Sequence, residues 1–462
     1  MTPTQIIILS AISVYFAAMI LIGLIASRNQ SHDGFVIGSR DVGYIPTIGS
    51  LASSFRDGMG VVFWFGFGAT AGYGGLWLIV GAVAGLFLYA LIGPRVRELA
   101  KKHDYITIGE MIRARIGVVS EKTTALIVIA FALAYIAIQL FVSGNLFATV
   151  LGIEAWIGVV SVAVVVGFYL FFGGYSTVVK TDAIQFFLII SLILVPFFFQ
   201  PGKEDVMNIG TLFSQSVDFQ WGIGLLGFFL VLGSADTWQR VFSARNDKVI
   251  RASFPLAGVM LGIMTLSLIF LGLAAKPYLG ENIAAEKAFF LIFEGDYIPS
   301  WLLAYIAVVV MAICMSTLDT MCYLTAATIG KNFMPPRVTE RREQYVPLSR
   351  IVMVVILIAM SVLALTISDV IQFLFNASSL LFILAPVYLA VALGLPHRKH
   401  RETDVLITLS VVASTIIYLF LFVNGYFDGS LMMTMIPVGV SIMLTGIVLV
   451  MDKYGLINHS TK

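Results

Sequence analysis

Apolar residues in this chain are grouped into runs that are long enough to cross a lipid bilayer. A transmembrane α-helix needs about 20 mostly apolar residues, and inside lipid only helices and closed barrels satisfy their own backbone polar groups. We therefore expect an all-α, polytopic membrane protein with about thirteen transmembrane helices. The expected spans are 5–26, 45–72, 75–94, 124–151, 155–173, 178–199, 219–238, 250–275, 298–330, 350–368, 370–395, 404–424 and 431–451.

The composition excludes several other classes of protein. Of the 462 residues, 59% are apolar and 12% are charged, and this charged share is about half that of a soluble domain. A soluble enzyme, a disordered chain and a nucleic-acid-binding protein are therefore excluded. The two cysteines, Cys314 and Cys322, lie in one apolar run, which argues against a disulfide framework. The first run lacks a preceding basic segment, so we interpret it as a retained helix and not as a signal peptide.

Basic residues are distributed unevenly between the two sets of loops. The loops and tail that follow odd-numbered spans carry 24 Lys and Arg residues, whereas the opposite loops carry only Lys203, Lys276 and Lys287. The positive-inside rule then places the N-terminus outside and the C-terminus in the cytoplasm, in the plasma (inner) membrane. No loop exceeds roughly 30 residues, so we expect one membrane domain over 1–462 and a function located among the helices.

Two expected spans contain segments that disfavour a continuous helix. Residues 49–60 include three glycines, three serines and the adjacent charges Arg56 and Asp57, and residues 221–240 are rich in glycine. Non-helical backbone at membrane depth is tolerated where it lines a cavity inside the protein. Matched helix breaks in the two halves of a transporter mark a binding site near the bilayer midplane. The alternative is that the glycines only allow close helix packing.

The breaks suggest a division of the chain into two five-helix halves, each of which begins with a broken helix. The expected parts are an extra N-terminal helix and loop over 1–44, a first repeat over 45–199, a second repeat over 219–395, and two C-terminal helices with a tail over 404–462.

The ninth span carries polar side chains that are spaced for one helix face. Ser316, Asp319 and Thr320 lie at positions i, i+3 and i+4, and Thr317 lies about 100° from Ser316 around the helix. Hydroxyl and carboxylate oxygens are hard ligands that suit a cation such as sodium. The alternative for the hydroxyls is a hydrogen bond to a carbonyl of the same helix.

Three sequence segments resemble the sodium:solute symporter family. The first is Gly173-Gly174 followed by Thr181-Asp182 and Gln185; the others are Met315-Ser-Thr-Leu and Gln239-Arg240 with Ala244. The resemblance covers nearly the whole chain. It implies a LeuT-like fold with a 5+5 inverted repeat, one additional N-terminal helix and two additional C-terminal helices.

The resemblance also implies sodium sites. The first would use the carbonyls of Phe55, Gly58 and Ile313 and the hydroxyls of Ser316 and Thr317. A second site, present in some members, would use Asp182 together with Ser316, Asp319 and Thr320. Asp319 stands where Ser is more usual, so this second site is more acidic than in relatives.

Arg56 departs from the family pattern. It either pairs with a carboxylate of the substrate or serves as an internal counter-ion to Asp57, and the count of buried charges does not decide between these readings. In that count, Asp236 is expected to neutralise Arg240 at position i+4 near the end of the seventh span. The other candidates for substrate binding or gating are Asp57, Gln139, Asn145, Trp238 and Asn376, with Trp64, Ser143 and Ser379 as weaker ones.

We therefore expect sodium-coupled secondary active uptake of a small organic solute, an amino acid or a small carboxylate, by alternating access. The expected partners are the solute, sodium ions and the lipid bilayer, without nucleic acid. The sequence shows no nucleophile–base pair or phosphate-binding loop, so an enzyme is not expected. The alternative is a solute sensor or a proton-coupled relative with the same fold and no sodium-driven accumulation.

Overall fold

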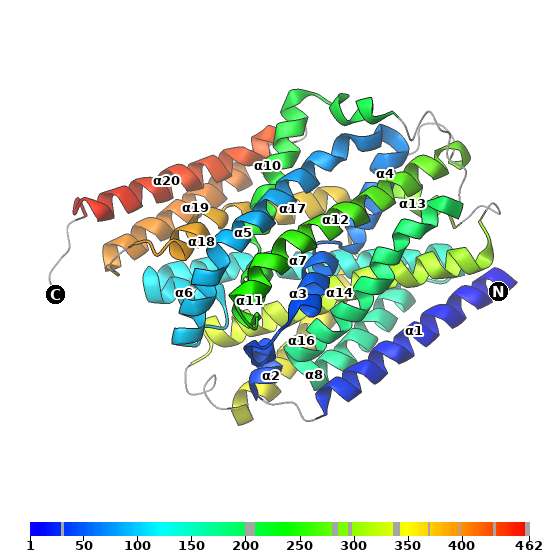
Figure 1. Ribbon diagram of the computed structural model, residues 1–462, viewed down its shortest axis with the longest axis horizontal. Coiled ribbons are helices and arrows are strands. Elements are labelled where there is room, and N and C mark those ends of the chain that lie inside the picture. Colours follow the sequence, from blue (N-terminus) through cyan, green and yellow to red (C-terminus); the bar gives the residue numbers. More distant parts are fainter. Residues whose placement is uncertain are drawn as a thin grey trace.

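The computed structural model describes residues 1–28, 32–198, 208–279, 285–293, 298–335, 342–367, 370–396, 399–427 and 431–457. Long helices run side by side in one bundle, and α1 begins at the end opposite to that where α20 ends (Figure 1). In these ranges the only extended pairing is an isolated bridge between Val42 and Ala244. This bridge joins the start of α3 to the end of α11.

The described elements of residues 1–198 are α1 (Pro3–Ser27), α2 (His32–Ile37), η1 (Gly38–Arg40), α3 (Tyr44–Ser54), α4 (Gly58–Ala71), η2 (Gly72–Gly75), α5 (Leu76–His103), α6 (Ile108–Arg115), α7 (Val118–Leu151), α8 (Ala155–Ile190) and η3 (Ser191–Phe198).

The elements of the rest of the chain are η4 (Ile209–Phe213), α10 (Val217–Gly233), α11 (Ala235–Ser243), α12 (Asp247–Ala275), η5 (Lys276–Tyr278), α13 (Ala285–Leu291), α14 (Ser300–Phe333), α16 (Arg342–Ala364), α17 (Val370–Phe382), α18 (Ala385–Ala392), α19 (Arg401–Val423), η6 (Leu431–Met435) and α20 (Ile436–Lys453).

The described helices confirm a polytopic all-α membrane protein. Nine segments are long and apolar enough to cross a bilayer, or ten if the bent pair α10 and α11 counts as one span. Two of these segments each overlap two expected spans, because Gly58–His103 joins α4 to α5 and Ala155–Pro196 joins α8 to η3. The exact number of thirteen crossings stays a prediction.

Several expected loops contain helix. The prediction of a continuous loop over 95–123 is wrong. Helix α5 continues to His103, α6 follows, and α7 already begins at Val118. An apolar run marks only the part of a helix that lies inside the bilayer. Good helix-forming residues such as Arg, Glu, Leu and Lys allow the helix to extend beyond the bilayer into water. The short helix α13 similarly lies within the loop expected over 276–297.

The loop expected between the fifth and sixth spans is replaced by a kink in α8. At Gly174 the backbone has φ 51° and ψ −148°, and helix continues on both sides. Only glycine enters this region readily. A Cβ atom at this position would also lie 2.5 Å from Cδ2 of Phe35, so α2 packs directly into the kink.

Both expected helix breaks are present. Residues 55–57 separate α3 from α4, and α10 and α11 meet at Ser234 with a bend of 49°. Close helix packing, the alternative role of the glycines, is also present in α10, because a Cβ atom at Gly227 would lie 2.0 Å from the carbonyl oxygen of Leu78. The glycines of α10 therefore bring it against α5, while the break itself occurs at Ser234.

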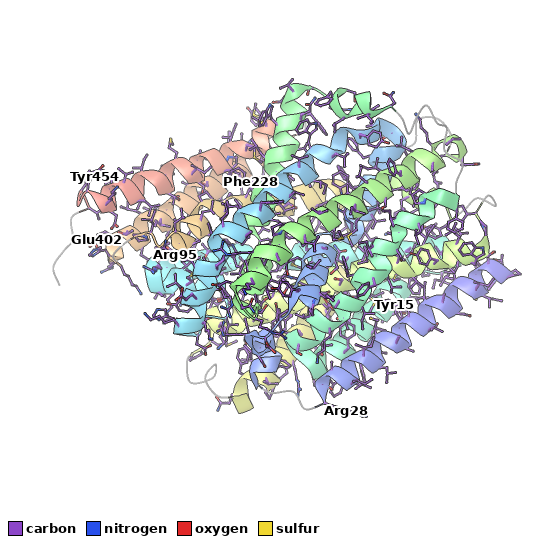
Figure 2. The ribbon with its side chains drawn as sticks, in the orientation of Figure 1. Tyr15, Arg28, Arg95, Phe228, Glu402 and Tyr454 are labelled. Atoms are coloured by element: carbon purple, nitrogen blue, oxygen red, sulfur yellow. The ribbon has the colours of Figure 1, made fainter. Side chains whose placement is uncertain are left out.

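Two of the basic residues that follow odd-numbered expected spans lie toward one end of the bundle. Figure 2 shows Arg28 and Arg95 toward the ends of α1 and α5 that lie on the same side as Glu402 and Tyr454. This arrangement agrees with the uneven charge distribution of the loops, and the assignment of that side to the cytoplasm stays a prediction.

Candidate sodium and solute site

The interruption between α3 and α4 is organised by Asp57. Its backbone is extended (φ −87°, ψ 166°), and its side chain caps α4 by accepting a hydrogen bond from the Gly60 N–H at 2.5 Å. An aspartate at this position satisfies one of the free N–H groups at a helix N-terminus and favours its dipole. The Asp57 side chain therefore stabilises the start of α4 and with it the break between α3 and α4.

Two other helices lie directly against the break. The N–H of Gly58 donates to Oε1 of Gln139 on α7 at 2.7 Å. A Cβ atom at Gly58 would lie 2.3 Å from Sγ of Cys314 on α14. Glycine at position 58 thus allows α14 to approach the break closely, at the helical turn that carries Ser316 and Thr317.

The residues of the first expected sodium site lie around this contact. The Ser316 hydroxyl is 3.0 Å from the hydroxyl of Ser53 at the end of α3. The hydroxyl of Thr317 is buried and has no hydrogen-bond partner, which is unusual for a buried polar group. The last carbonyls of a helix, such as that of Phe55, also lack a partner within the helix. These oxygens match the preference of sodium for hard ligands.

A network of buried charges lies next to these hydroxyls and is centred on Arg240 of α11. Arg240 pairs with Asp236 at 2.9 Å, as the i,i+4 spacing predicted, and its Nη2 is 3.7 Å from Asp182 on α8. It also donates to the hydroxyls of Ser50 at 3.0 Å and Ser54 at 2.5 Å. Buried ions are stable only with such charge partners and hydrogen bonds.

The role of the three serines of α3 was not predicted from the sequence. Ser50, Ser53 and Ser54 have the same i, i+3, i+4 spacing as Ser316, Asp319 and Thr320, so each set marks one face of its helix. The structure places the two faces opposite each other, with Ser54 3.4 Å from Thr320. That shared spacing is the signal that could have identified them.

The four residues of the second expected sodium site lie close together but make three separate sets of contacts: one of Asp182 with Ser316, one of Thr320, and one of Asp319. Asp182 accepts hydrogen bonds from Ser316 at 2.5 Å and from Ser50 at 2.6 Å. Thr320 faces Ser54 and Arg240. The second site stays a prediction.

Asp319 points toward other side chains of α8. Its Oδ2 accepts from the hydroxyl of Tyr169 at 2.8 Å and lies 3.4 Å from that of Thr181, and its Oδ1 has no hydrogen-bond partner although the residue is fully buried. Asp319 therefore has one free carboxylate oxygen inside the bundle.

Arg56 lies at the break with 1% of its surface exposed. Its Nη2 donates to the hydroxyl of Thr265 on α12, and its guanidinium lies 5.7 Å from the ring centre of Trp64. Its Nε and Nη1 have no hydrogen-bond partner. Although Asp57 is adjacent in sequence, the described ion pairs do not include one between the two residues.

The remaining candidates differ in their surroundings. Gln139 contacts the break through Gly58 and has a buried Nε2 without a partner. Asn145 donates to the carbonyl of Phe141 in its own helix at 2.9 Å. Trp238 is fully buried and donates to Leu232, with its ring 4.7 Å from that of Tyr89, so it packs the core. The Asn376 side chain lies outside the described residues.

Proteins of similar sequence or structure include several transporters. The chain is 23% identical over 386 residues to a sodium/proline symporter of Staphylococcus aureus, covering 76% of this chain and 74% of that protein. It superimposes on a substrate-bound, outward-open Na⁺-coupled sialic acid symporter with a TM-score of 0.82 at 15% identity, covering 99% and 98% of the two chains. It also superimposes on a mutant of the Eremococcus coleocola manganese transporter with a TM-score of 0.55 at 15% identity, covering 90% and 95%.

The model of the sodium:solute symporter family matches residues 35–395. This range contains both helix breaks, the Arg240 network and the hydroxyl pair of α14, and it accounts for most of the chain. The chain therefore belongs to the sodium:solute symporter family, and it is a sodium-coupled transporter of small solutes, not an enzyme.

Proposed function

We propose that this symporter takes up a small solute with a carboxylate group, such as an amino acid or a small organic acid. The observation that carries the proposal is the buried guanidinium of Arg56, which has two nitrogens without hydrogen-bond partners at the interruption between α3 and α4. Arginine binds carboxylates through paired hydrogen bonds in a fixed geometry.

The energetics of burial support a ligand at Arg56. A buried charge without a partner costs several kcal/mol, and the contacts with Thr265 and Trp64 compensate only part of this cost. Asp57 is already used as the cap of α4. A carboxylate that arrives with the solute would supply the missing acceptor and charge.

In the proposal, sodium binding is coupled to solute binding at Arg56 through the break between α3 and α4. In the proposed mechanism sodium binds between the end of α3 and α14, at Phe55, Gly58, Ile313, Ser316 and Thr317. It thereby fixes the backbone that carries Arg56. If sodium raises the affinity for the solute, the solute raises the affinity for sodium by the same factor.

In the proposal the exit route lies on the expected cytoplasmic side, where a cavity of about 10 Å³, the size of one water molecule, lies between α6, α7, α11, α14 and α18. Its lining includes Gln239, Thr328 and Tyr388, and two polar atoms there, Nε2 of Gln239 and the Tyr388 hydroxyl, have no hydrogen-bond partner. Asn332 on α14, which also lines this cavity, donates to Glu121 on α7 at 3.0 Å. In the proposal this contact closes the route until the loaded site opens inward.

The test is a thermal-stability screen of the purified protein over small solutes, in sodium and in potassium. Ligands that bind the folded state raise its apparent stability by mass action. We expect stabilisation by carboxylate-bearing solutes that depends on sodium. Amides and esters of the same solutes should stabilise at least 10-fold more weakly, as judged by the concentration required.

Arg56→Gln should abolish this preference for the free carboxylate, and Arg56→Lys should restore part of it. Arg251→Gln is the control, because Arg251 is exposed at the start of α12. Equal binding of acids and amides by the wild-type protein would contradict the proposed substrate class. A sensor is distinguished by proteoliposomes, in which it would bind solute without accumulating it.

A further inference from the structure

An apolar groove lies on the outer surface of the bundle between α8 and α16, which pack side by side (Figure 1). Its volume is about 820 Å³, and every lining residue except Ser361 is apolar or glycine. The Ser361 hydroxyl is satisfied by the Leu357 carbonyl of its own helix at 2.7 Å. The wall of the groove therefore offers no free polar partner.

The groove extends along much of the membrane thickness. Its lining on α8 runs from Trp156 to Phe172, which corresponds to about 24 Å of helix within a hydrocarbon core of about 30 Å. The floor is formed in part by Gly167, where a Cβ atom would lie 3.1 Å from Cδ1 of Leu357. Glycine at this position therefore allows Leu357 of α16 to pack closely against α8.

Arg350 stands at one end of this groove. Its guanidinium lies 5.0 Å from the ring centre of Phe171, which lines the groove, and 5.7 Å from that of Phe35. Its Nε is buried and has no hydrogen-bond partner, and no carboxylate of the described residues forms an ion pair with it. A half-buried cation without a carboxylate partner among the described residues thus adjoins the apolar groove.

We propose that the groove binds an anionic phospholipid, with one acyl chain along α8 and α16 and the phosphate at Arg350. The occupant must be apolar over most of its length and anionic at one end, which is the chemistry of this lipid class. Arginine recognises phosphate by paired, charge-assisted hydrogen bonds. In the expected orientation Arg350 faces the cytoplasmic leaflet, which is rich in anionic lipids.

The experiment measures lipid binding to the purified, full-length protein by native mass spectrometry and by thermal stability. The probes are phosphatidylglycerol and phosphatidylcholine of identical acyl chains, with glycerol phosphate as the headgroup without chains. We expect phosphatidylglycerol to bind at least 10-fold more tightly than phosphatidylcholine, and glycerol phosphate to have no effect. Equal binding of the two lipids would overturn the proposal.

Two variants test the two parts of the site. Arg350→Gln should reduce the preference for phosphatidylglycerol to below 3-fold, whereas Arg251→Gln should leave it unchanged. Gly167→Leu should fill the groove and weaken binding of both lipids, with Val80→Leu, an exposed position on α5, as its control. Arg350→Lys retains the charge if Arg350→Gln does not fold. A protein dimer that covers the groove and excludes lipid would also refute the proposal.

Discussion

The Ser316 hydroxyl on α14 donates a hydrogen bond of 2.5 Å to the Asp182 carboxylate on α8. The same hydroxyl lies 3.0 Å from Ser53 on α3, and Asp182 lies 3.7 Å from Arg240 on α11. One contact therefore connects the interrupted helix α3–α4 with the buried charges of α11. A sodium ion that recruits the Ser316 oxygen would redistribute these hydrogen bonds, which gives ion binding a direct effect on both interrupted helices.

Thr317→Ala is expected to weaken sodium binding by at least 10-fold, equivalent to about 1.4 kcal/mol, with little change in stability without sodium. The Thr317 hydroxyl has no hydrogen-bond partner to lose. The measurement is the sodium concentration that half-saturates solute binding. Thr325→Ala is the control on the same helix, because the Thr325 hydroxyl donates to the Met321 carbonyl at 2.8 Å. An unchanged sodium requirement in Thr317→Ala would remove Thr317 from the site.

Asp319→Ser is expected to lower the number of sodium ions transported per solute, because it removes the free carboxylate oxygen near α8. The measurement compares uptake of labelled sodium and labelled solute in proteoliposomes. Stability should fall by about 1–3 kcal/mol, since the buried Tyr169 hydroxyl loses its acceptor. Asp319→Asn retains an acceptor for Tyr169 and separates the loss of charge from the loss of packing. An unaltered ratio in both variants would exclude Asp319 from ion binding.

Arg240→Met is expected to destabilise the fold by about 3–5 kcal/mol, because it leaves the buried carboxylates of Asp236 and Asp182 without their cation. The measurement is the unfolding temperature in detergent. Asp236→Asn in the same chain should restore part of the loss by removing one uncompensated charge. If the double variant is less stable than Arg240→Met, the charge balance assigned to this network is incorrect.

Gly174→Ala is expected to cost about 1–3 kcal/mol. The position has φ 51°, and the added Cβ atom would lie 2.5 Å from Phe35. Gly439→Ala is the control, because a Cβ atom there would meet no neighbouring atom within 4 Å and alanine favours helix. We therefore expect Gly174→Ala to lower the thermal unfolding temperature, and Gly439→Ala to leave it unchanged or raise it. Equal shifts would show that the kink tolerates a side chain.

Asn332→Ala is expected to open the cytoplasmic route more often. Asn332 joins Glu121 on α7 at 3.0 Å and approaches Thr107, before α6, at 3.4 Å. A cysteine introduced at Thr328, which lines the same cavity as Asn332, should react faster with a thiol reagent added from the cytoplasmic side. Ser410→Ala, which breaks a hydroxyl contact with Thr445 elsewhere in the bundle, should leave that rate unchanged. Slower labelling in Asn332→Ala would contradict a closing role.

The sequence by itself determined the class of the protein and the elements that carry the site. Long apolar runs allow only helices in lipid, and the polar segment at Arg56-Asp57 could not continue a helix through the membrane. Spacing along one helix predicted the pair between Asp236 and Arg240, because it depends only on local helix geometry.

Contacts between distant helices were decided only by the tertiary structure. The sequence could not show that Ser50 and Ser54 bind Arg240, or that Asp319 points to Tyr169, because side-chain direction depends on how α3, α8, α11 and α14 rotate against one another. Packing of α2 against α8 places Phe35 at the Gly174 kink, and packing of α12 against the break places Thr265 at Arg56, which has no ion-pair partner among the described residues. Local periodicity defines a helix face, and only packing decides what that face meets.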